Sequence, residues 1–140
     1  MLENTADQGS SLGGHLERLA WGLELINAPK QMGVCLDVCH FFAAGYALTD
    51  HASYLSLKKQ ISSTIGIKTV RLIHLNDSAK SFGSRVDHHA PIGKGMIGSR
   101  PFSFWVNDPA WKNTPRILET QGGDKNYARE LRLLRRLRTA

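Results

Sequence analysis

Short apolar runs alternate along the chain with longer segments of helical periodicity. Three of the runs are too short for helices and predict buried parallel strands, at residues 33–36, 70–73 and 116–118. Apolar residues recur every three or four positions in three further segments, at residues 16–26, 57–65 and 127–137. Strands that alternate with helices are typical of βα units around a parallel sheet.

The ends of these segments carry their own signals. Ser10 and Ser11 precede the first helical segment and are candidate N-caps, and Gly66 follows the second as a helix stop. Residues 2–6 have the pattern of a strand that enters a loop, but a strand is usually about five or six residues long. Either these residues are not a strand, or the chain begins within one. We expect residues 1–140 to form one domain, a partial barrel of about four βα units.

Metal-binding side chains stand at the ends of the predicted strands, each about one βα unit after the last: Glu3, Asp37, His74 and Glu119. Taken singly, each is more commonly a helix cap, a loop carboxylate or a core histidine. Corresponding ends of successive parallel strands converge on one face, however, and in a β/α barrel active sites occupy that face. The recurrence at every strand end therefore predicts a shared site.

A second set of candidate ligands lies close to the first in sequence. His40 follows Asp37 by three positions, and Asp87 and His89 form an Asp-x-His pair in a polar segment. Histidine nitrogen and carboxylate oxygen suit borderline divalent ions such as Zn²⁺ or Mn²⁺. Asp-x-His alone is also common in surface loops, so this set gains weight only from the first.

Composition narrows the class of protein. No apolar run approaches the roughly 18 residues of a membrane span, and the N-terminus lacks the basic and apolar regions of a secretory signal. Two cysteines, Cys35 and Cys39, cannot make a disulfide framework, and we expect them to be reduced core residues. These features predict a cytoplasmic protein without membrane contact.

The formal charge of +6, from 18 Lys+Arg against 12 Asp+Glu, weakly favours a polyanionic partner. Gly93-Lys94-Gly95 lacks the remaining residues of a phosphate-binding P-loop. It is more simply a turn, although a glycine turn can also direct backbone N–H groups at a phosphate. The arginine-rich segment near the C-terminus is most simply the solvated face of a helix.

Several motifs together resemble one known family, endonuclease IV (deoxyribonuclease IV, AP endonuclease family 2), and specifically its C-terminal half. The motifs that carry the resemblance are Leu2-Glu3-Asn4-Thr5-Ala6, Cys35-Leu36-Asp37-Val38-Cys39-His40, His74-Leu75-Asn76-Asp77-Ser78, Asp87-His88-His89, Ile92-Gly93-Lys94-Gly95 and Leu118-Glu119-Thr120. The resemblance implies half of a (β/α)₈ TIM barrel and a zinc-dependent enzyme of base excision repair. Such an enzyme cleaves the phosphodiester 5′ to abasic sites in double-stranded DNA.

The resemblance also implies roles for individual residues. One zinc would be held by His40, Asp87 and His89, and a second by Asp37, His74 and Glu119. Glu3 would bridge the second ion to a third, so Glu3 and Glu119 become the candidate catalytic carboxylates. His88 and Lys94 become candidate DNA contacts, although the family usually has arginine where this chain has His88.

The family places two further histidine ligands in a first half of the barrel that this chain lacks. A half barrel leaves two open sheet edges, so we expect an incomplete or inactive enzyme, or one half of an assembly with a companion chain. Two other functions stay open. A sugar isomerase or epimerase on a related barrel would use a single divalent ion. A non-catalytic DNA-binding module would use only the positive charge.

Overall fold

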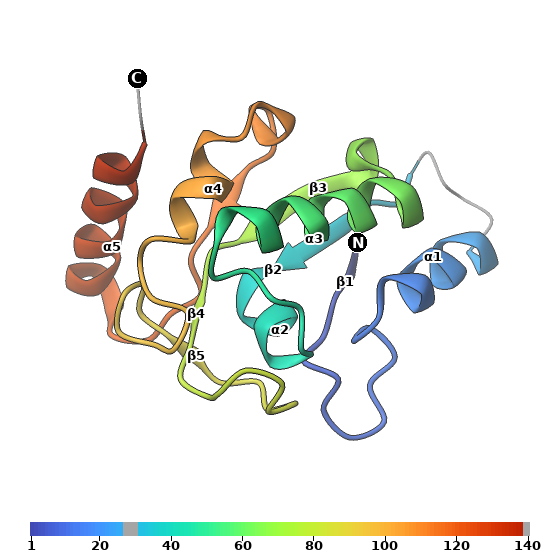
Figure 1. Ribbon diagram of the computed structural model, residues 1–140, viewed down its shortest axis with the longest axis horizontal. Coiled ribbons are helices and arrows are strands. Elements are labelled where there is room, and N and C mark those ends of the chain that lie inside the picture. The colour runs from blue at the N-terminus through green and yellow to red at the C-terminus, as the bar shows by residue number, and fades with distance from the viewer. Residues whose placement is uncertain (27–30, 139–140) are drawn as a thin grey trace.

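The computed structural model describes residues 1–26 and 31–138. Its central feature is a parallel sheet with the strand order β1-β2-β3-β6. The strands are β1 (Leu2–Glu3), β2 (Val34–Asp37), β3 (Val70–His74) and β6 (Arg116–Ile117). The longer helices are α1 (Leu16–Leu25), α3 (His51–Thr64) and α5 (Gly123–Leu137). Figure 1 shows α3 in front of β2 and β3, with α1 and α5 toward opposite ends of the molecule.

The predicted strands and their parallel arrangement are confirmed. In the register of the sheet, Asp37 lies beside His74, and His74 lies beside Ile117. Glu3 of β1 lies beside Cys35, two residues before Asp37. The carboxyl ends of the four strands are therefore nearly level, which brings the polar residues at those ends to one edge of the sheet. Strand β6 is one residue shorter than the segment 116–118 that was predicted.

The predicted helices are also confirmed, but one of the predicted caps is wrong. The N-cap of α1 is His15, not Ser10 or Ser11, and it makes no side-chain hydrogen bond to the helix. Ser11 instead shares a hydrogen bond with Thr5 in the preceding loop, at 3.0 Å between the two hydroxyl oxygens. Gly66 does end the second helical segment. Its φ of 81° and the hydrogen bond from its N–H to the Ile61 carbonyl are typical of a helix C-terminus.

Several short elements follow the strands and were not predicted. Helix α2 (Val38–Ala43) begins directly after β2, and every residue in it is buried. After β3 the chain forms an antiparallel ladder between β4 (Asp77–Ser78) and β5 (His89–Ala90). Helix α4 (Phe102–Asn107) and the 3₁₀ segments η1 (Ile67–Thr69) and η2 (Pro109–Trp111) complete the fold. The ladder and α2 both flank the carboxyl end of the sheet, where they add side chains to the site.

The core lies between the sheet and the helices. Leu36 and Ile73 of the sheet share one apolar cluster with Leu19 of α1, Ile61 of α3 and Trp105 of α4. Cys35 and Cys39 are free and buried, as predicted. Among the described residues, no helix is both long enough and apolar enough to cross a lipid bilayer.

Strands β1 and β6 are the edges of the sheet, and exposed apolar side chains lie near both. Met1 precedes β1, and Trp21 and Leu25 are exposed on α1, which contacts β1. At the other edge, Ile117 of β6 and Leu131 of α5 are exposed and line one shallow apolar groove. Apolar surface of this kind promotes association with other protein surfaces.

Candidate metal centre

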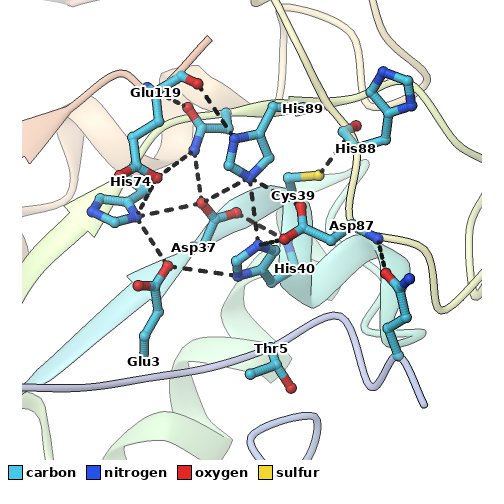
Figure 2. Close-up of polar contacts among 12 residues, drawn as sticks. Glu3, Thr5, Asp37, Cys39, His40, His74, Asp87, His88, His89 and Glu119 are labelled. Atoms are coloured by element: carbon cyan, nitrogen blue, oxygen red, sulfur yellow. Dashed lines mark hydrogen bonds and ion pairs between the residues drawn. The ribbon is translucent and has the colours of Figure 1, made fainter. Parts of the chain in front are cut away.

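The first group of candidate ligands surrounds one imidazole nitrogen. Nδ1 of His74, at the end of β3, lies 2.9 Å from Oε2 of Glu119, 3.0 Å from Oε1 of Glu3 and 3.5 Å from Oδ2 of Asp37. Ligand atoms of these four residues all lie within 4.8 Å of one another. Three carboxylates around one imidazole nitrogen form a donor set that suits a divalent cation. Figure 2 shows the four side chains directed at one another. Glu3, Asp37 and His74 lie on separate strands, and Glu119 lies just after β6.

The second group combines two histidines with a carboxylate. Nε2 of His40 lies 3.1 Å from Oδ2 of Asp87, and Nε2 of His89 lies 3.4 Å from Oδ1 of the same side chain. The two Nε2 atoms are 3.4 Å apart. Donor atoms of all three residues lie within 4.8 Å of one another. Two imidazole nitrogens that face each other and a carboxylate match the donor set of a zinc site with an open position.

The two groups touch each other and form one cluster. Nε2 of His89 lies 3.6 Å from Oδ2 of Asp37, and Nδ1 of His40 lies 3.6 Å from Oε1 of Glu3. All seven residues singled out from the sequence as ligands are therefore brought together. Their roles as metal ligands stay a prediction. In the same region, the Cys35 sulfur and donor atoms of Glu3 and His74 lie within 4.8 Å of one another. The same holds for the Cys39 sulfur and donor atoms of Asp37 and His89.

Asp37 has two functions in this arrangement. It is the last residue of β2 and also the N-cap of α2, because its Oδ1 accepts a hydrogen bond from the His40 N–H at 2.9 Å. The cap leaves Oδ2 directed at His74 and His89. A helix cap and a metal ligand, which were alternatives for Asp37 in the sequence, are thus compatible in one side chain.

Two buried asparagines orient the candidate ligands, and sequence reasoning did not single them out. The Asn4 side chain accepts a hydrogen bond from the Asp37 N–H and donates one to the Asp37 carbonyl, at 2.6 and 3.0 Å. The Asn76 amide donates to Oδ2 of Asp37 at 2.7 Å and accepts from the Glu119 N–H at 2.8 Å. Each asparagine follows a candidate ligand by one or two positions in a motif that carries the family resemblance, and that position was the available signal.

Hydrogen bonding also fixes the orientation of one histidine ring. Nδ1 of His40 lies 2.8 Å from the Asn4 carbonyl oxygen, so this nitrogen donates its proton there. Nε2 is then left without a proton in the neutral ring and faces Asp87 and His89. A backbone carbonyl that holds the distal nitrogen of an imidazole is the usual second contact of a metal-binding histidine.

The electrostatics of the cluster favour positive charge. Burial lowers the pKa of His74, but hydrogen bonds with Asp37, Cys35 and Glu3 outweigh it and raise that pKa to about 12. Burial likewise opposes the charged form of His40, whose pKa is nevertheless raised by Asp37 and Asp87. Burial raises the pKa of Asp37, yet its contacts with His74, His40 and His89 lower it overall. A bound divalent cation would supply the same positive charge and displace these protons.

The two candidate DNA contacts lie outside the cluster. The side chains of His88 and Lys94 are exposed. The turn that carries Lys94 does not present free amides to a phosphate, because the N–H groups of Gly93 and Gly95 donate to Oδ2 of the buried Asp77 at 2.9 and 3.0 Å. The interpretation of Gly93-Lys94-Gly95 as a plain turn is therefore correct, and backbone phosphate binding there is not supported.

Comparison with known proteins identifies the family. The model of the xylose isomerase-like TIM barrel family matches residues 1–137. The chain therefore belongs to this family. Within it, the resemblance to endonuclease IV is confirmed. A probable endonuclease 4 of Chloroflexus aggregans is 46% identical over 124 residues, which are 89% of this chain and 43% of that protein. Another from Citrifermentans bemidjiense is 42% identical over 139 residues, covering 98% of this chain and 49% of that protein.

A solved structure agrees with this placement in the xylose isomerase-like family. The crystal structure of endonuclease IV from Thermus thermophilus superposes with a TM-score of 0.86 at 38% identity. The superposition covers 98% of this chain and 48% of that one. The chain thus spans about half the length of the curated relatives it matches. The predicted fold class, a part of a TIM barrel built on a parallel sheet, is confirmed.

Proposed function

We propose that the cluster is the metal centre of a zinc-dependent AP endonuclease, which hydrolyses the DNA phosphodiester 5′ to abasic sites during base excision repair. One observation carries this proposal. The group of His40, Asp87 and His89 lies within 3.6 Å of the group around His74. Two adjacent ions can act together on the attacking and leaving oxygens of a phosphoryl displacement. The probable endonuclease 4 relatives support the same class of reaction.

The residues have separate tasks in this proposal. His40, Asp87 and His89 would hold one ion and Asp37, His74 and Glu119 a second, and Glu3 would help to hold the second ion and a third. Bound zinc supplies Lewis acidity toward a phosphate oxygen and activates water near neutral pH. Asp37 is fully buried, whereas the side chains of Glu3 and Glu119 are 37% and 41% exposed. A substrate can therefore reach Glu3 and Glu119, as it can Asp87, whose side chain is 49% exposed. This exposure agrees with catalytic roles for Glu3 and Glu119, although the assignment itself comes from the family resemblance.

A sugar isomerase or epimerase remains the rival within the same family of barrels. Such an enzyme would need one ion and has no evident use for the His40 group. The number of bound ions therefore separates the two functions: two or more zinc ions per chain support the nuclease, and one ion supports the isomerase. A non-catalytic DNA-binding module predicts instead that Asp37→Ala and His74→Ala leave DNA affinity unchanged.

We further propose that incision requires a companion chain that supplies the other barrel strands. The chain spans about half the length of its relatives, and β1 and β6 are open edges of the described sheet. The exposed apolar side chains near both edges are consistent with such a partner. Alone, the chain would bind zinc but leave abasic DNA intact.

The test combines metal counting with an incision assay. The purified chain is dialysed against zinc, its bound metal is counted, and it is incubated at low salt with duplex DNA that contains an abasic-site analogue. The assay is repeated with the N-terminal half of Thermus thermophilus endonuclease IV as a stand-in companion. We expect at least two zinc ions per chain and 5′ incision only in the mixture, lost in Glu119→Ala. Zinc-free protein would contradict the metal centre, and incision by the chain alone would contradict the need for a companion.

A further inference from the structure

One buried carboxylate outside the metal cluster contacts two of the segments that carry candidate ligands. Glu130 lies on α5 and is 0% exposed. Its Oε1 accepts a hydrogen bond from the Ile92 N–H at 2.6 Å. Its Oε2 accepts one from the Thr120 hydroxyl at 2.5 Å and one from the Asn126 amide at 2.8 Å. Within residues 1–26 and 31–138, no lysine or arginine nitrogen lies within 4.0 Å of this carboxylate. A buried carboxylate without a cation is costly, so its hydrogen bonds must offset that cost.

The two backbone segments that Glu130 joins belong to different ligand groups. Ile92 lies three residues after His89, and Thr120 directly follows Glu119. The two segments approach each other at the site itself, where Nδ1 of His89 lies 3.5 Å from the Glu119 carbonyl oxygen. The Glu130 carboxylate, on α5, thus contacts the same pair of segments.

Neither segment is held by an extensive strand ladder. His89 lies in β5, which has two residues and pairs with a β4 of two residues. Glu119 follows β6, which also has two residues. Beyond Ile92 the chain is fixed by Asp77, which accepts hydrogen bonds from the N–H groups of Gly93, Gly95 and Ile97. Besides the contact of the His89 ring with the Glu119 carbonyl, the Glu130 side chain joins the His89 segment to the Glu119 segment by hydrogen bonds to Ile92 and Thr120.

We infer that Glu130 is a positioning residue for the candidate metal centre, because its carboxylate sets the spacing between His89 and Glu119. This inference rests on the proposed function, since it concerns the ligands of that centre. Groups that orient metal ligands through hydrogen bonds change metal affinity by about 10–100-fold when they are removed. An effect of that size on zinc binding is therefore the mark of this function, whereas a purely structural carboxylate would change stability alone.

The test replaces Glu130 with its amide. Glu130→Gln keeps the size of the side chain but turns one acceptor into an NH₂ group, which faces the Ile92 N–H or the Thr120 hydroxyl. We measure zinc affinity by titration calorimetry and the visible spectrum after substitution with Co²⁺, which reports ligand geometry. The expected result is a roughly 10–100-fold weaker affinity and an altered Co²⁺ spectrum in a folded protein.

A matched variant separates positioning from stability. Asp108→Asn makes the same change at another largely buried carboxylate, which is bonded to Lys58 and Tyr54 and lies outside the metal cluster. We expect this variant to lose stability and to bind zinc as the unmodified chain does. Equal losses of zinc affinity in Glu130→Gln and Asp108→Asn would overturn the inference, because both would then reflect general destabilisation.

A milder variant covers the case in which Glu130→Gln does not fold. Thr120→Val removes one hydrogen bond to Glu130 and nearly preserves side-chain volume. We expect Thr120→Val to lose less zinc affinity than Glu130→Gln does. Where Glu130→Gln folds, we expect faster hydrogen exchange of its Ile92 amide. If Glu130→Gln folds and its zinc affinity is unchanged, the inference is overturned and the proposed function is intact. If Glu130→Gln does not fold, unchanged zinc affinity in Thr120→Val has the same meaning. Failure of the unmodified chain to bind zinc would overturn the proposed function, and the inference with it.

Discussion

Two clusters of polar side chains balance their carboxylate charge in different ways. Between α3 and α4, Oδ2 of Asp108 lies 2.6 Å from the Lys58 ammonium and accepts a hydrogen bond from the Tyr54 hydroxyl at 2.8 Å. At the carboxyl end of the sheet, four carboxylates face only three histidines. In the part of the chain that the structure describes, no lysine or arginine nitrogen lies within 4.0 Å of those four carboxylates.

Asp108 and Lys58 form an ion pair that needs no bound ion, whereas the carboxylates at the carboxyl end of the sheet depend on a cation that can be exchanged. Burial raises the pKa of Asp108, but its bonds with Lys58, Ala110 and Tyr54 lower it overall. The pKa of Asp37 is also lowered, although burial raises it, because Asp37 contacts His74, whose charge depends on a proton. The ammonium of Lys58 is a covalent part of the chain, whereas a proton on histidine can be replaced by a metal ion. The first cluster therefore stabilises the fold, and the second is suited to binding.

The largest expected effect comes from the same substitution in both clusters. Asp37→Asn should lose one bound zinc ion and all metal-dependent incision in the complemented assay, because the amide is a poor zinc ligand. It should keep the cap of α2, since Oδ1 can still accept the His40 N–H. Asp108→Asn should retain all bound zinc but lose roughly 1–3 kcal/mol of stability, the cost of a weakened buried hydrogen-bonded pair. Metal counting and urea denaturation measure the two outcomes, and zinc loss in both variants would erase the distinction.

The same contrast shows what could be predicted from sequence. The four candidate ligands at strand ends were accessible because strand ends recur at βα intervals, and β2 and β3 are marked by short apolar runs. His40, Asp87 and His89 gained weight only from those four and from the family resemblance. The contacts of Asp108 with Lys58 and Tyr54 were not accessible, since they join residues 50 and 54 positions apart without a repeating pattern. Helix α2 and the β4–β5 ladder were too short for any periodicity to appear. Glu130 looked like one of the polar residues on an exposed helix face.

Zinc should stabilise Asp37→Asn less than it stabilises the unmodified chain or Asp108→Asn. Ligands that bind only the folded state add about 2.7 kcal/mol per site at a free concentration roughly 100 times the dissociation constant. We expect an increment of that size for each occupied site in the unmodified chain and in Asp108→Asn. In Asp37→Asn, the increment from one site should disappear. Urea denaturation with and without zinc, and again after a chelator, measures these values; an increment that survives in full in Asp37→Asn would place the ions elsewhere.

The pH dependence should also differ between the clusters. The pKa of His74 is raised from 6.5 to about 12 in the folded chain, so its contribution to stability is complete below pH 6.5 and is lost as pH rises toward 12. Asp37, whose pKa is lowered from 3.8, contributes above pH 3.8 and loses that contribution as pH falls further. The zinc-free chain should therefore become less stable from about pH 6.5 to about pH 9, and stabilisation by zinc should grow over the same range because fewer protons compete with the metal.

A control isolates the histidine in this experiment. In His74→Gln the decline between about pH 6.5 and pH 9 should be reduced, because the glutamine has no proton to lose. In Asp108→Asn the decline should match that of the unmodified chain, since the pKa of Asp108 is lowered from 3.8 and lies below this range. Urea midpoints at half-unit steps of pH measure the effect. A zinc-free chain whose stability rises over this range would contradict the assigned charge on His74.

The smallest expected effect extends the contrast between fixed and exchangeable charge to the protein surface. His88 is exposed beside the candidate ligands Asp87 and His89. His88→Arg introduces a permanent cation that can contact a phosphate at any pH. We expect slightly tighter DNA binding at about pH 8, with the slope of log affinity against log salt steeper by about 0.9 for one added phosphate contact.

Lys94→Ala should change the slope by about the same amount in the opposite direction. Lys68→Ala is the matched control, because exposed Lys68 lies just before β3 at the opposite end of that strand from His74. An equal change of slope in Lys68→Ala would mean that DNA is attracted by the net charge of +6 rather than by the surface around the metal centre.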